Sequence, residues 1–365
     1  MSKSLSRNLK VAVVGATGAV GKELISILQE RSFPVGELVP FASPRSLGKP
    51  IELNGKEYPC QVLKAGCFEG IDIAFFDASD AISKEWVPQA VEAGAWVVDN
   101  SATFRMEEDV LLLVPEVNGD LLEARLQESA RGRFPRDRII AGPNCSTVQL
   151  VMALKPIQER WGLKRVVVST YQSASGAGAA AMDELAEQTM GVFNQKPVEP
   201  QAFKHQLAFN CIPQIGGFKG DGYTSEEQKI MEESRKLLRM PQLKVTATAV
   251  RVPAFSCHGE SVHIECERLP EGSSDWVQEV REALRAHPGI IVQDDPSKFI
   301  YPMGNAGEKS IVESATGRDA VYVGRIRKDP SLDNGLNLWV VSDNLRKGAA
   351  LNAVQIGEII IKSLG

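Results

Sequence analysis

The stretch "KVAVVGATGAVGKELISILQE" (residues 10–30) joins a predicted strand to a predicted helix through a glycine-rich loop. Lys10–Gly15 is a short apolar run rich in valine, and Ala19–Glu30 carries apolar side chains at helical spacing. Similar patterns follow up to residue 141, namely strands at Glu37–Ala42, Asp72–Phe76, Ala95–Val98 and Arg138–Ala141, and a helix near Lys84–Ala93. Buried strands that alternate with helices predict a parallel sheet of βαβ units, and hence a Rossmann-like domain.

The loop in this stretch has the spacing G-x-x-G-x-x-G, with Gly15, Gly18 and Gly21. Such a turn lets backbone N–H groups at a helix N-terminus approach a pyrophosphate, which indicates a dinucleotide site. The alternative interpretation is a strand–helix turn that simply favours glycine. The position of the loop inside a βαβ pattern makes the dinucleotide site the better hypothesis.

The segment after the second strand, "FASPRSLGK" (residues 41–49), contains no acidic residue. NAD-binding folds commonly place Asp or Glu there to hold the ribose hydroxyls. Ser43, Arg45 and Ser46 offer hydroxyl and cationic groups that suit a 2′-phosphate, so the sequence favours NADP. An exposed polar loop is the alternative interpretation.

The pattern changes after residue 145, where longer strands with a period of two suggest a mixed or antiparallel sheet. Helices are expected at Thr147–Pro156, Gly176–Met190 and Leu345–Leu364, and strands at Arg165–Tyr171, Lys244–Val252 and Ser261–Glu267. An Asp-Asn-Gly turn (residues 333–335) predicts a hairpin. The C-terminal helix is expected to return to the first domain. The predicted fold is therefore an α/β chain with a Rossmann-like domain and a mixed-sheet domain.

The composition narrows the function classes. The 365 residues carry a net charge of −5, which gives no electrostatic footprint for nucleic acid or an anionic membrane. No run of about 18 apolar residues is present, so we expect no membrane span. The six cysteines form no CxxC pair and no zinc-type Cys/His spacing, so we expect no metal. Reduced thiols in a chain of this length indicate a cytoplasmic protein.

Cys145, in "GPNCST", lies where a predicted strand meets a predicted helix. A lone cysteine is often a buried structural residue. At this position, however, the positive end of the helix dipole stabilises a thiolate, and the N–H groups of Ser146 and Thr147 would face an oxyanion. A thiolate beside a nicotinamide cofactor suggests attack on an acyl phosphate or aldehyde, followed by hydride exchange. From the residues alone, both interpretations remain open.

Other candidate site residues also follow predicted strands. His258 is expected in a loop after the strand that ends at Arg251, where a surface histidine is the alternative. Arg105 follows the strand of "AWVVDN". The segment "TSEEQK" (residues 224–229) opens a helix capped by its first Thr or Ser. Glu226 and Lys229 of this segment share one face of the helix and are candidate site residues. The alternative interpretation is a solvated i,i+3 ion pair.

These motifs together resemble the aspartate-β-semialdehyde dehydrogenase family along nearly the whole chain. The motifs "GATGAVG", "FASPRSLGK", "VVDNSATFR", "VPEVN", "GPNCST", "YQSASGAG", "AFNCIPQIGGF", "EEQK", "RVP…H" and "NLRKGAALNAVQI" occur in the family's order. The resemblance implies reduction of L-aspartyl-4-phosphate by NADPH to L-aspartate 4-semialdehyde and phosphate, a step toward lysine, threonine and methionine. It implies no partner other than these small molecules and a second copy of the chain, as a homodimer or a dimer of dimers.

The resemblance also implies roles for individual residues. Cys145 is expected to form the thioacyl enzyme, His258 to act as acid/base catalyst, and Gln172 to orient the substrate or acyl intermediate. Arg251 is expected to pair with the substrate α-carboxylate and Glu226 with its amino group. Phosphate is expected to bind Arg105, Lys229 and Asn144. The residues expected at the cofactor are Gly15, Thr17, Gly18, Ala19, Val20, Gly21, Ser43, Arg45, Ser46, Ser175, Gly176 and Asn344.

The resemblance further implies an NADP-binding domain of residues 1–143, completed by 344–365, and a catalytic and dimerisation domain of residues 144–343. One departure from the family pattern is "FFDASDAIS" (residues 75–83), which replaces a loop richer in glycine and serine. Contacts of the cofactor at this loop are therefore open. Cys257 directly precedes His258, and its effect on reactivity is open as well.

Three alternatives remain beside this reading. N-acetyl-γ-glutamyl-phosphate reductase shares the chemistry, but its cysteine loop resembles G-N-P-G-C-Y, and an amine-binding Glu226 would be pointless for an acetylated substrate. A catalytically silent protein that senses NADPH would bind cofactor without turnover. An extended short-chain dehydrogenase would need a Tyr-x-x-x-Lys pair, and none of the five tyrosines has lysine four residues later.

Overall fold

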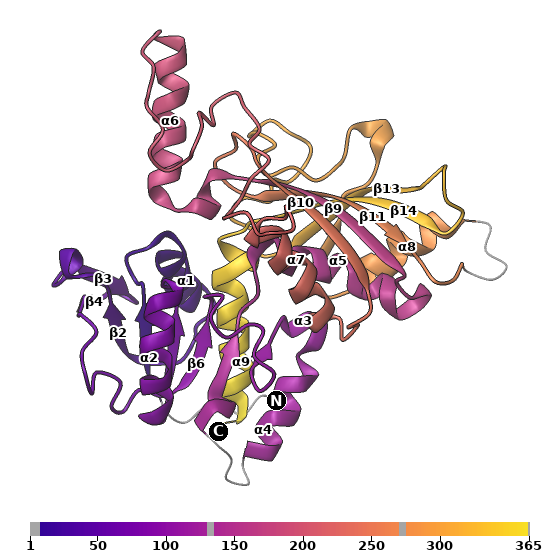
Figure 1. Cartoon of the computed structure of the whole chain (residues 1–365). Coiled ribbons are helices and arrows are strands. Elements are labelled where there is room, and N and C mark those ends of the chain that lie inside the picture. Colours follow the sequence, from indigo (N-terminus) through magenta and orange to yellow (C-terminus); the bar gives the residue numbers. More distant parts are fainter. Residues whose placement is uncertain (1–7, 130–134, 270–274, 364–365) are drawn as a thin grey trace. The chain divides into compact units, whose positions relative to one another are not determined.

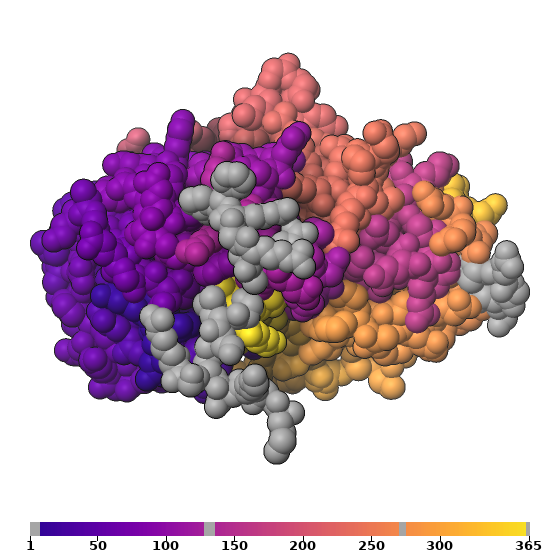
Figure 2. All heavy atoms as spheres, turned by 90° about the horizontal axis from the view of Figure 1, so that it is seen from below, coloured from indigo at the N-terminus to yellow at the C-terminus, as the bar shows by residue number. Residues whose placement is uncertain are grey.

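The computed structural model describes residues 8–129, 135–269 and 275–363, and the chain divides into two compact units. Unit 1 comprises Met1–Asn144 and Ala349–Gly365, and unit 2 comprises Cys145–Gly348. Figure 2 draws unit 1 from indigo to purple and most of unit 2 from magenta to orange, and a small yellow area of the C-terminal segment is visible. The sequence predicts junctions at 143/144 and 343/344, a few residues from these.

A six-stranded sheet forms the centre of unit 1. Its strands are β1 (Leu9–Val14), β2 (Val35–Phe41), β5 (Ile73–Phe76), β6 (Trp96–Asp99), β7 (Leu111–Leu112) and β8 (Ile139–Ala141). They lie in the order β2-β1-β5-β6-β8-β7, and every pairing is parallel. The prediction of a parallel N-terminal sheet is confirmed.

Helices flank this sheet, and a small hairpin lies beside it. The helices are α1 (Ala19–Glu30), α2 (Asp80–Glu92), α3 (Pro115–Asn118), α4 (Asp120–Ser129) and α9 (Leu351–Ser363), and the hairpin joins β3 (Pro50–Leu53) to β4 (Lys56–Pro59). Helix α2 begins before the predicted Lys84, because the Ser79 hydroxyl accepts a hydrogen bond from the N–H of Ile82 and caps the helix.

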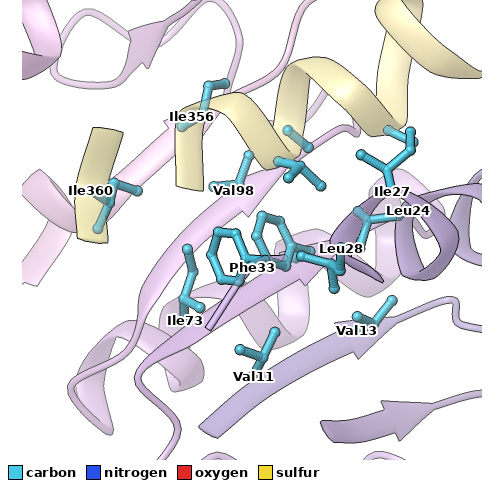
Figure 3. Packing of buried hydrophobic residues seen from close by; sticks show 14 of the residues in the cluster. Val11, Val13, Leu24, Ile27, Leu28, Phe33, Ile73, Val98, Ile356 and Ile360 are labelled. Atoms are coloured by element: carbon cyan, nitrogen blue, oxygen red, sulfur yellow. The ribbon is translucent and has the colours of Figure 1, made fainter. Parts of the chain in front are cut away.

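The C-terminal helix α9 packs within unit 1, as predicted. Ile356 and Ile360 of α9 join the same apolar cluster as Leu24 and Ile27 of α1 and Val13 of β1 (Figure 3). A π-helix (Arg346–Ala350) precedes α9, so the predicted helix Leu345–Leu364 consists of two segments. Leu364 lies outside the described residues. Burial of this apolar face explains why the last segment completes the first unit.

A mixed sheet forms the centre of unit 2, which confirms the predicted architecture. Its strands are β9 (Arg165–Gln172), β10 (Lys244–Arg251), β11 (His258–Glu265), β12 (Ile290–Val292), β13 (Val321–Lys328) and β14 (Gly335–Ser342). They lie in the order β10-β9-β11-β14-β13-β12. The pairs β9–β10 and β12–β13 are parallel, and the other neighbours are antiparallel.

Three helices of unit 2 lie along one face of this sheet, and α6 (Ala179–Phe193) lies apart from it (Figure 1). The three are α5 (Cys145–Trp161), α7 (Ser225–Leu237) and α8 (Trp276–Ala286). Helix α5 continues beyond the predicted end at Pro156, because Ile157 and Trp161 remain buried on its next turn. Within the described ranges, no helix combines the length and apolar character needed to cross a bilayer.

Candidate functional site

The glycine loop of unit 1 has no room for side chains at two of its glycines. A Cβ on Gly21 would lie 2.2 Å from the carbonyl oxygen of Gly15, and a Cβ on Gly15 would lie 2.0 Å from that of Asp77. Gly15 has φ +92°, a conformation that favours glycine. Gly18 is the N-cap of α1 and offers no side chain to its first N–H groups. Thr17, Ala19 and Val20 are half-buried beside it. The geometry suits an anion at this helix N-terminus.

The segment after β2 forms a short 3₁₀ turn, Pro44–Ser46. Ser43 and Arg45 are exposed, while Ser46 is buried. Residues 42–49 contain hydroxyl and cationic groups and no carboxylate. The structure therefore leaves hydroxyl and cationic side chains after β2, at the position where many NAD-binding folds carry a carboxylate.

Asp77 lies at the glycine loop, in the segment that departs from the family pattern. A Cβ on Gly18 would lie 4.0 Å from its Oδ2. Its carboxyl group accepts hydrogen bonds from the Asn100 side chain and from the backbone N–H of Gly21. Burial raises the pKa of Asp77 to about 6, against the lowering effect of those bonds, and the charge of Asp99 raises it further. An ionisable carboxyl group therefore contacts the helix N-terminus where a pyrophosphate would bind.

Arg105 and Asn144 also belong to unit 1, and both are buried. Nη2 of Arg105 donates a hydrogen bond to the carbonyl oxygen of Asn100 (2.6 Å). Burial raises the pKa of Asp99, while its bonds from Ser101 and the nearby charge of Arg105 lower it. The Arg105 side chain therefore lies at the carboxyl end of β6, where its sequence position predicts it.

In unit 2, the ends of three adjacent strands bring predicted site residues together. Gln172 ends β9, Arg251 ends β10 and His258 begins β11. The sheet register pairs Gln172 with both Arg251 and His258. His258 therefore belongs to a strand and not to the predicted loop, because β11 begins three residues before the predicted Ser261. It is 0% exposed, which excludes the alternative of a surface histidine.

Cys145 is the first residue of the 17-residue helix α5, and it is half-buried. The helix N-terminus is fixed to the sheet, because Nε2 of Gln172 donates a hydrogen bond to the Ser146 hydroxyl (2.7 Å). Gly348 also lies close to this cysteine, because a Cβ on Gly348 would be 3.0 Å from the Cβ of Cys145. Cys145 also lies close enough to Arg251 to interact with its charge, because the negative thiolate form of Cys145 raises the pKa of Arg251. The cysteine is therefore part of the cluster at the strand ends, not sealed in apolar packing.

His258 is held in one tautomer. The backbone N–H of Ser173 donates to its Nδ1 (3.1 Å), so the neutral ring carries its proton on Nε2. Nε2 makes no hydrogen bond within the described residues. Burial, and then the positive charge of Arg251, lower the pKa of His258 to about 3. The ring is therefore neutral at pH 7 and presents an N–H donor.

Arg251 and Glu226 contribute opposite charges to this cluster. Burial lowers the pKa of Arg251, while Cys145 and Glu226 act in the other direction. Glu226 lies on the first turn of α7, which Thr224 caps as predicted, and its Oε1 accepts a hydrogen bond from Gln172 (3.3 Å). Lys229 lies 3.6 Å from the other oxygen of Glu226 and is more exposed. The pair is therefore more than a solvated ion pair, because Glu226 is buried.

Three residues predicted at the cofactor also lie beside His258 and Arg251. Asn344 Oδ1 accepts hydrogen bonds from the hydroxyls of Ser173 (3.2 Å) and Ser175 (3.0 Å). A Cβ on Gly176 would lie 3.0 Å from Nη1 of Arg251 and from Cε1 of His258. Sequence reasoning named Ser146 only for its backbone N–H and missed the role of its hydroxyl, and it missed Ser173 and Gly348 altogether, although all three lie inside the quoted motifs. Their polar or minimal side chains there were the only available signal.

The thiol of the neighbouring Cys257 is buried. Cys257 has φ +67°, and its sulfur lies 3.2 Å from the Thr316 hydroxyl. Burial raises its pKa to about 12, so it stays protonated at neutral pH. Burial also raises the pKa of the thiols of Cys60 and Cys266. Across the described residues, no group of three or more His, Cys, Asp or Glu side chains could hold a metal ion.

Comparison with known proteins agrees with this geometry. Two family models match the chain: "Semialdehyde dehydrogenase, NAD binding domain" over residues 10–125 and "Semialdehyde dehydrogenase, dimerisation domain" over residues 154–347. An aspartate-semialdehyde dehydrogenase of Aquifex aeolicus (strain VF5) is 49% identical over 97% of this chain and 98% of that protein.

Solved structures are similar as well. The crystal structure of aspartate semialdehyde dehydrogenase II from Vibrio cholerae, complexed with ASA, has a TM-score of 0.86 and 44% identity, over 98% of this chain and 99% of that one. The aspartate semialdehyde dehydrogenase from Candida albicans, solved with NADP, has a TM-score of 0.72 and 26% identity, over 98% and 99%. The chain belongs to the aspartate-semialdehyde dehydrogenase family.

Proposed function

We propose that the protein reduces L-aspartyl-4-phosphate to L-aspartate 4-semialdehyde and phosphate with NADPH, through a thioacyl intermediate on Cys145. The observation that carries this proposal is the cluster of Cys145, Gln172, Arg251 and His258 at one edge of the unit 2 sheet. The relatives' activity, and the ASA bound in the Vibrio cholerae structure, support the substrate.

The first step is attack of the Cys145 thiolate on the acyl carbon. The S–C bond forms, the C–O bond to phosphate breaks, and phosphate leaves with the electron pair. The N-terminus of α5 favours the thiolate through the helix dipole, and its first N–H groups stabilise the oxyanion. Gln172, fixed by Ser146, orients the acyl group.

The second step reduces the thioacyl carbon. When bound, NADPH supplies the hydride. His258 directs its Nε2–H to the carbonyl oxygen and stabilises the negative charge that gathers there. The C–S bond then breaks, Cys145 leaves as a thiolate, and the semialdehyde is released. Ser173 keeps the ring in the tautomer that this step needs.

The remaining site residues bind the ends of the substrates. We assign the α-carboxylate to Arg251, the amino group to Glu226 and the phosphate to Arg105, Lys229 and Asn144, because Arg and Lys are the usual partners of such anions. We assign NADP to the glycine loop of residues 15–21, to Ser43, Arg45 and Ser46, and to Ser175, Gly176 and Asn344. Unit 1 is then the cofactor domain and unit 2 the catalytic domain. The six free cysteines suit a cytoplasmic enzyme of lysine, threonine and methionine synthesis.

The direct test is an assay of the reverse reaction by absorbance at 340 nm. Purified protein with aspartate semialdehyde, phosphate and NADP⁺ should form NADPH, and omission of phosphate should stop the reaction. NAD⁺ should replace NADP⁺ poorly. Equal rates with the two cofactors would contradict the assignment of the loop at Arg45, and activity only with N-acetylglutamate semialdehyde would contradict the substrate.

Asp77→Asn should tighten NADP⁺ binding at pH values above about 6. Above its pKa of about 6, ionised Asp77 repels the pyrophosphate at the α1 N-terminus. Two like charges about 4 Å apart in water repel each other by about 1 kcal/mol, which corresponds to a roughly fivefold change in Kd. Calorimetry between pH 5 and pH 8 measures the Kd of both proteins. As the pH increases, the Kd of the natural protein should therefore rise relative to that of Asp77→Asn.

The matched control for this variant is Asp72→Asn, on the residue that precedes β5 at its other end. There the carboxyl group accepts the N–H of Lys10 (2.9 Å), which an amide oxygen can also accept. Its NADP⁺ affinity should follow the natural protein at every pH. A ratio of Kd values that stays constant with pH for Asp77→Asn would rule out repulsion by Asp77.

We further propose that the protein is a homodimer through the open face of the unit 2 sheet. That face holds a groove of about 820 Å³, lined by Tyr171, Phe255 and Trp339 among others. Tyr171 and Phe255 are 39% and 50% exposed, and the rings of Tyr171 and Trp339 lie 5.3 Å apart. Large exposed aromatic groups in one patch favour a protein partner, and the matched dimerisation model covers this sheet.

The double change Tyr171→Asp and Phe255→Asp should therefore convert the dimer into monomers. Each of the two substitutions would place a carboxylate in an apolar interface, and the free energy of dimerisation cannot offset the cost of burying that charge. Sedimentation velocity measures the change. Leu269→Asp, at an exposed apolar residue outside the groove, is the control and should remain dimeric. An unchanged dimer in the double variant would place the interface elsewhere.

A further inference from the structure

Glu260, the third residue of β11, is a buried carboxyl group that the mechanism above does not use. It is 0% exposed, and neither of its oxygens makes a hydrogen bond of normal geometry within the described residues. Side chains two apart on a strand point to the same side, so Glu260 shares the face of His258, toward α5. Buried polar groups are nearly always hydrogen-bonded, so a buried carboxyl group without such a bond requires a physical explanation.

The groups around Glu260 come from three other elements. The register places it opposite Thr170 of β9 and Val340 of β14, and the Thr170 hydroxyl has no hydrogen-bond partner in the described part of the chain. Gln149 of α5 faces the carboxyl group and can bond to it. The other end of that amide, Oε1, accepts a hydrogen bond from the Ser342 hydroxyl of β14 (2.6 Å).

The carboxyl group is held in its neutral form. No Lys or Arg forms an ion pair with it in the described ranges, and an ionised carboxylate without a cation is too costly in an apolar interior. Burial raises the pKa of Glu260 well above its ordinary value, and the nearby Gln149 amide, which lowers it, offsets only part of this rise. A neutral acid presents one donor and one acceptor, which match the amide of Gln149 and the hydroxyl of Thr170.

Gln149 lies one helical turn after Cys145, so its anchoring fixes the first turns of α5. Hydrogen bonds join this helix start to two strands, Ser146 to β9 and Gln149 to β14, and the Gln149 amide also faces Glu260 on β11, the strand between them. We propose that Glu260 is a positioning residue, which acts through Gln149 to hold Cys145 in place relative to His258. The inference rests on the proposed function only in taking Cys145 as the nucleophile.

The test compares Glu260→Gln and Glu260→Leu with the natural protein. Glu260→Gln keeps a neutral donor and acceptor, and its kcat should stay within about threefold. Glu260→Leu fills a similar volume but leaves Gln149 without its partner, and kcat should fall at least about tenfold while the KM for aspartate semialdehyde changes less than about twofold. The rate at which iodoacetamide alkylates Cys145, followed by mass spectrometry, should fall in Glu260→Leu alone and does not depend on turnover.

Glu265→Gln is the matched control, because it makes the same chemical change at the far end of β11, where Glu265 pairs with Lys164. It should leave kcat and alkylation unchanged. If Glu260→Leu does not fold, Gln149→Met removes the same contact from the helix side and should show the same loss of kcat. Unchanged kcat and alkylation in the apolar variant, or an equal loss in Glu260→Gln, would overturn the proposal. Alkylation results remain valid even if the assigned substrate is wrong.

The pH dependence of stability gives a second readout. The pKa of Glu260 is higher in the folded protein than in the unfolded chain, so unfolding releases a proton above about pH 4.3. The contribution of Glu260 to stability therefore falls as pH rises from there toward its folded pKa. Glu260→Gln does not titrate, so its Tm should exceed that of the natural protein by an amount that grows between pH 5 and pH 8. A constant difference in Tm would mean that Glu260 is ionised in the folded state.

Discussion

Cys145→Ala should lower kcat by at least about 10⁴-fold, while the Kd of NADP⁺ changes less than about twofold. The loss follows because, in the proposed mechanism, the Cys145 thiolate forms the thioacyl intermediate, and removal of a nucleophile costs this much in comparable enzymes. Cofactor affinity should persist, because the glycine loop and the Arg45 segment belong to unit 1 and lie in other elements. Initial rates at 340 nm and calorimetry with NADP⁺ measure the two quantities.

Covalent trapping makes this prediction sharper. With aspartate semialdehyde and NADP⁺ but no phosphate, the natural protein should gain the mass of one aspartyl group on the peptide that contains Cys145. Cys211→Ala removes an exposed thiol and Cys257→Ala a buried, protonated one, and both should keep the adduct and most of the activity. Turnover by Cys145→Ala above about 1% of the natural rate would refute the covalent mechanism.

The fold of unit 1 could be predicted because local patterns determine it. A buried parallel strand reads as a continuous apolar run, and α1 shows its apolar face at helical spacing, so β1 and α1 were predicted nearly to the residue. The return of α9 was also correct, since its apolar face needs a partner. The bounds of α5 were wrong, because proline usually ends a helix, yet Ile157 and Trp161 keep the next turn buried.

The site was predicted one residue at a time, whereas its geometry depends on pairing between distant strands. Cys145, Gln172 and Arg251 each end or begin an element, and the sequence marks such positions. It does not give the register, which sets Arg251 and His258 on either side of Gln172. For the same reason, the sequence put His258 in a loop, and it could not reveal that Ser173 fixes its tautomer.

Glu260 illustrates a further limit of sequence reasoning. On a strand with a period of two, the sequence "CHGESVHIE" places a glutamate where either face is possible. Only the antiparallel pairing with β9 and β14 turns it inward, toward Gln149. A charged residue type therefore became a buried neutral acid through tertiary context, which composition and periodicity do not encode.

Arg251→Leu should raise the KM for aspartate semialdehyde roughly 10- to 150-fold, with a smaller effect on kcat. A hydrogen-bonded ion pair with the substrate α-carboxylate contributes about 1.5–3 kcal/mol. Nη1 of Arg251 donates to the Ser173 carbonyl oxygen (2.6 Å), so the guanidinium group is already oriented in the absence of substrate. Arg251→Lys keeps the positive charge but loses the forked pair of N–H donors, so its KM should lie between that of the natural protein and that of Arg251→Leu.

The pH profile separates substrate binding from a structural effect of the same change. The positive charge of Arg251, after burial itself, lowers the pKa of His258, so its removal should raise that pKa. The acid limb of kcat/KM should therefore move to higher pH in Arg251→Leu but stay in place in Arg251→Lys. Arg165→Leu, at the exposed start of β9, is the control and should change neither quantity. An unchanged KM in Arg251→Leu would show that Arg251 does not bind the substrate carboxylate. If the acid limb of kcat/KM still shifted in that case, Arg251 would act only through the pKa of His258.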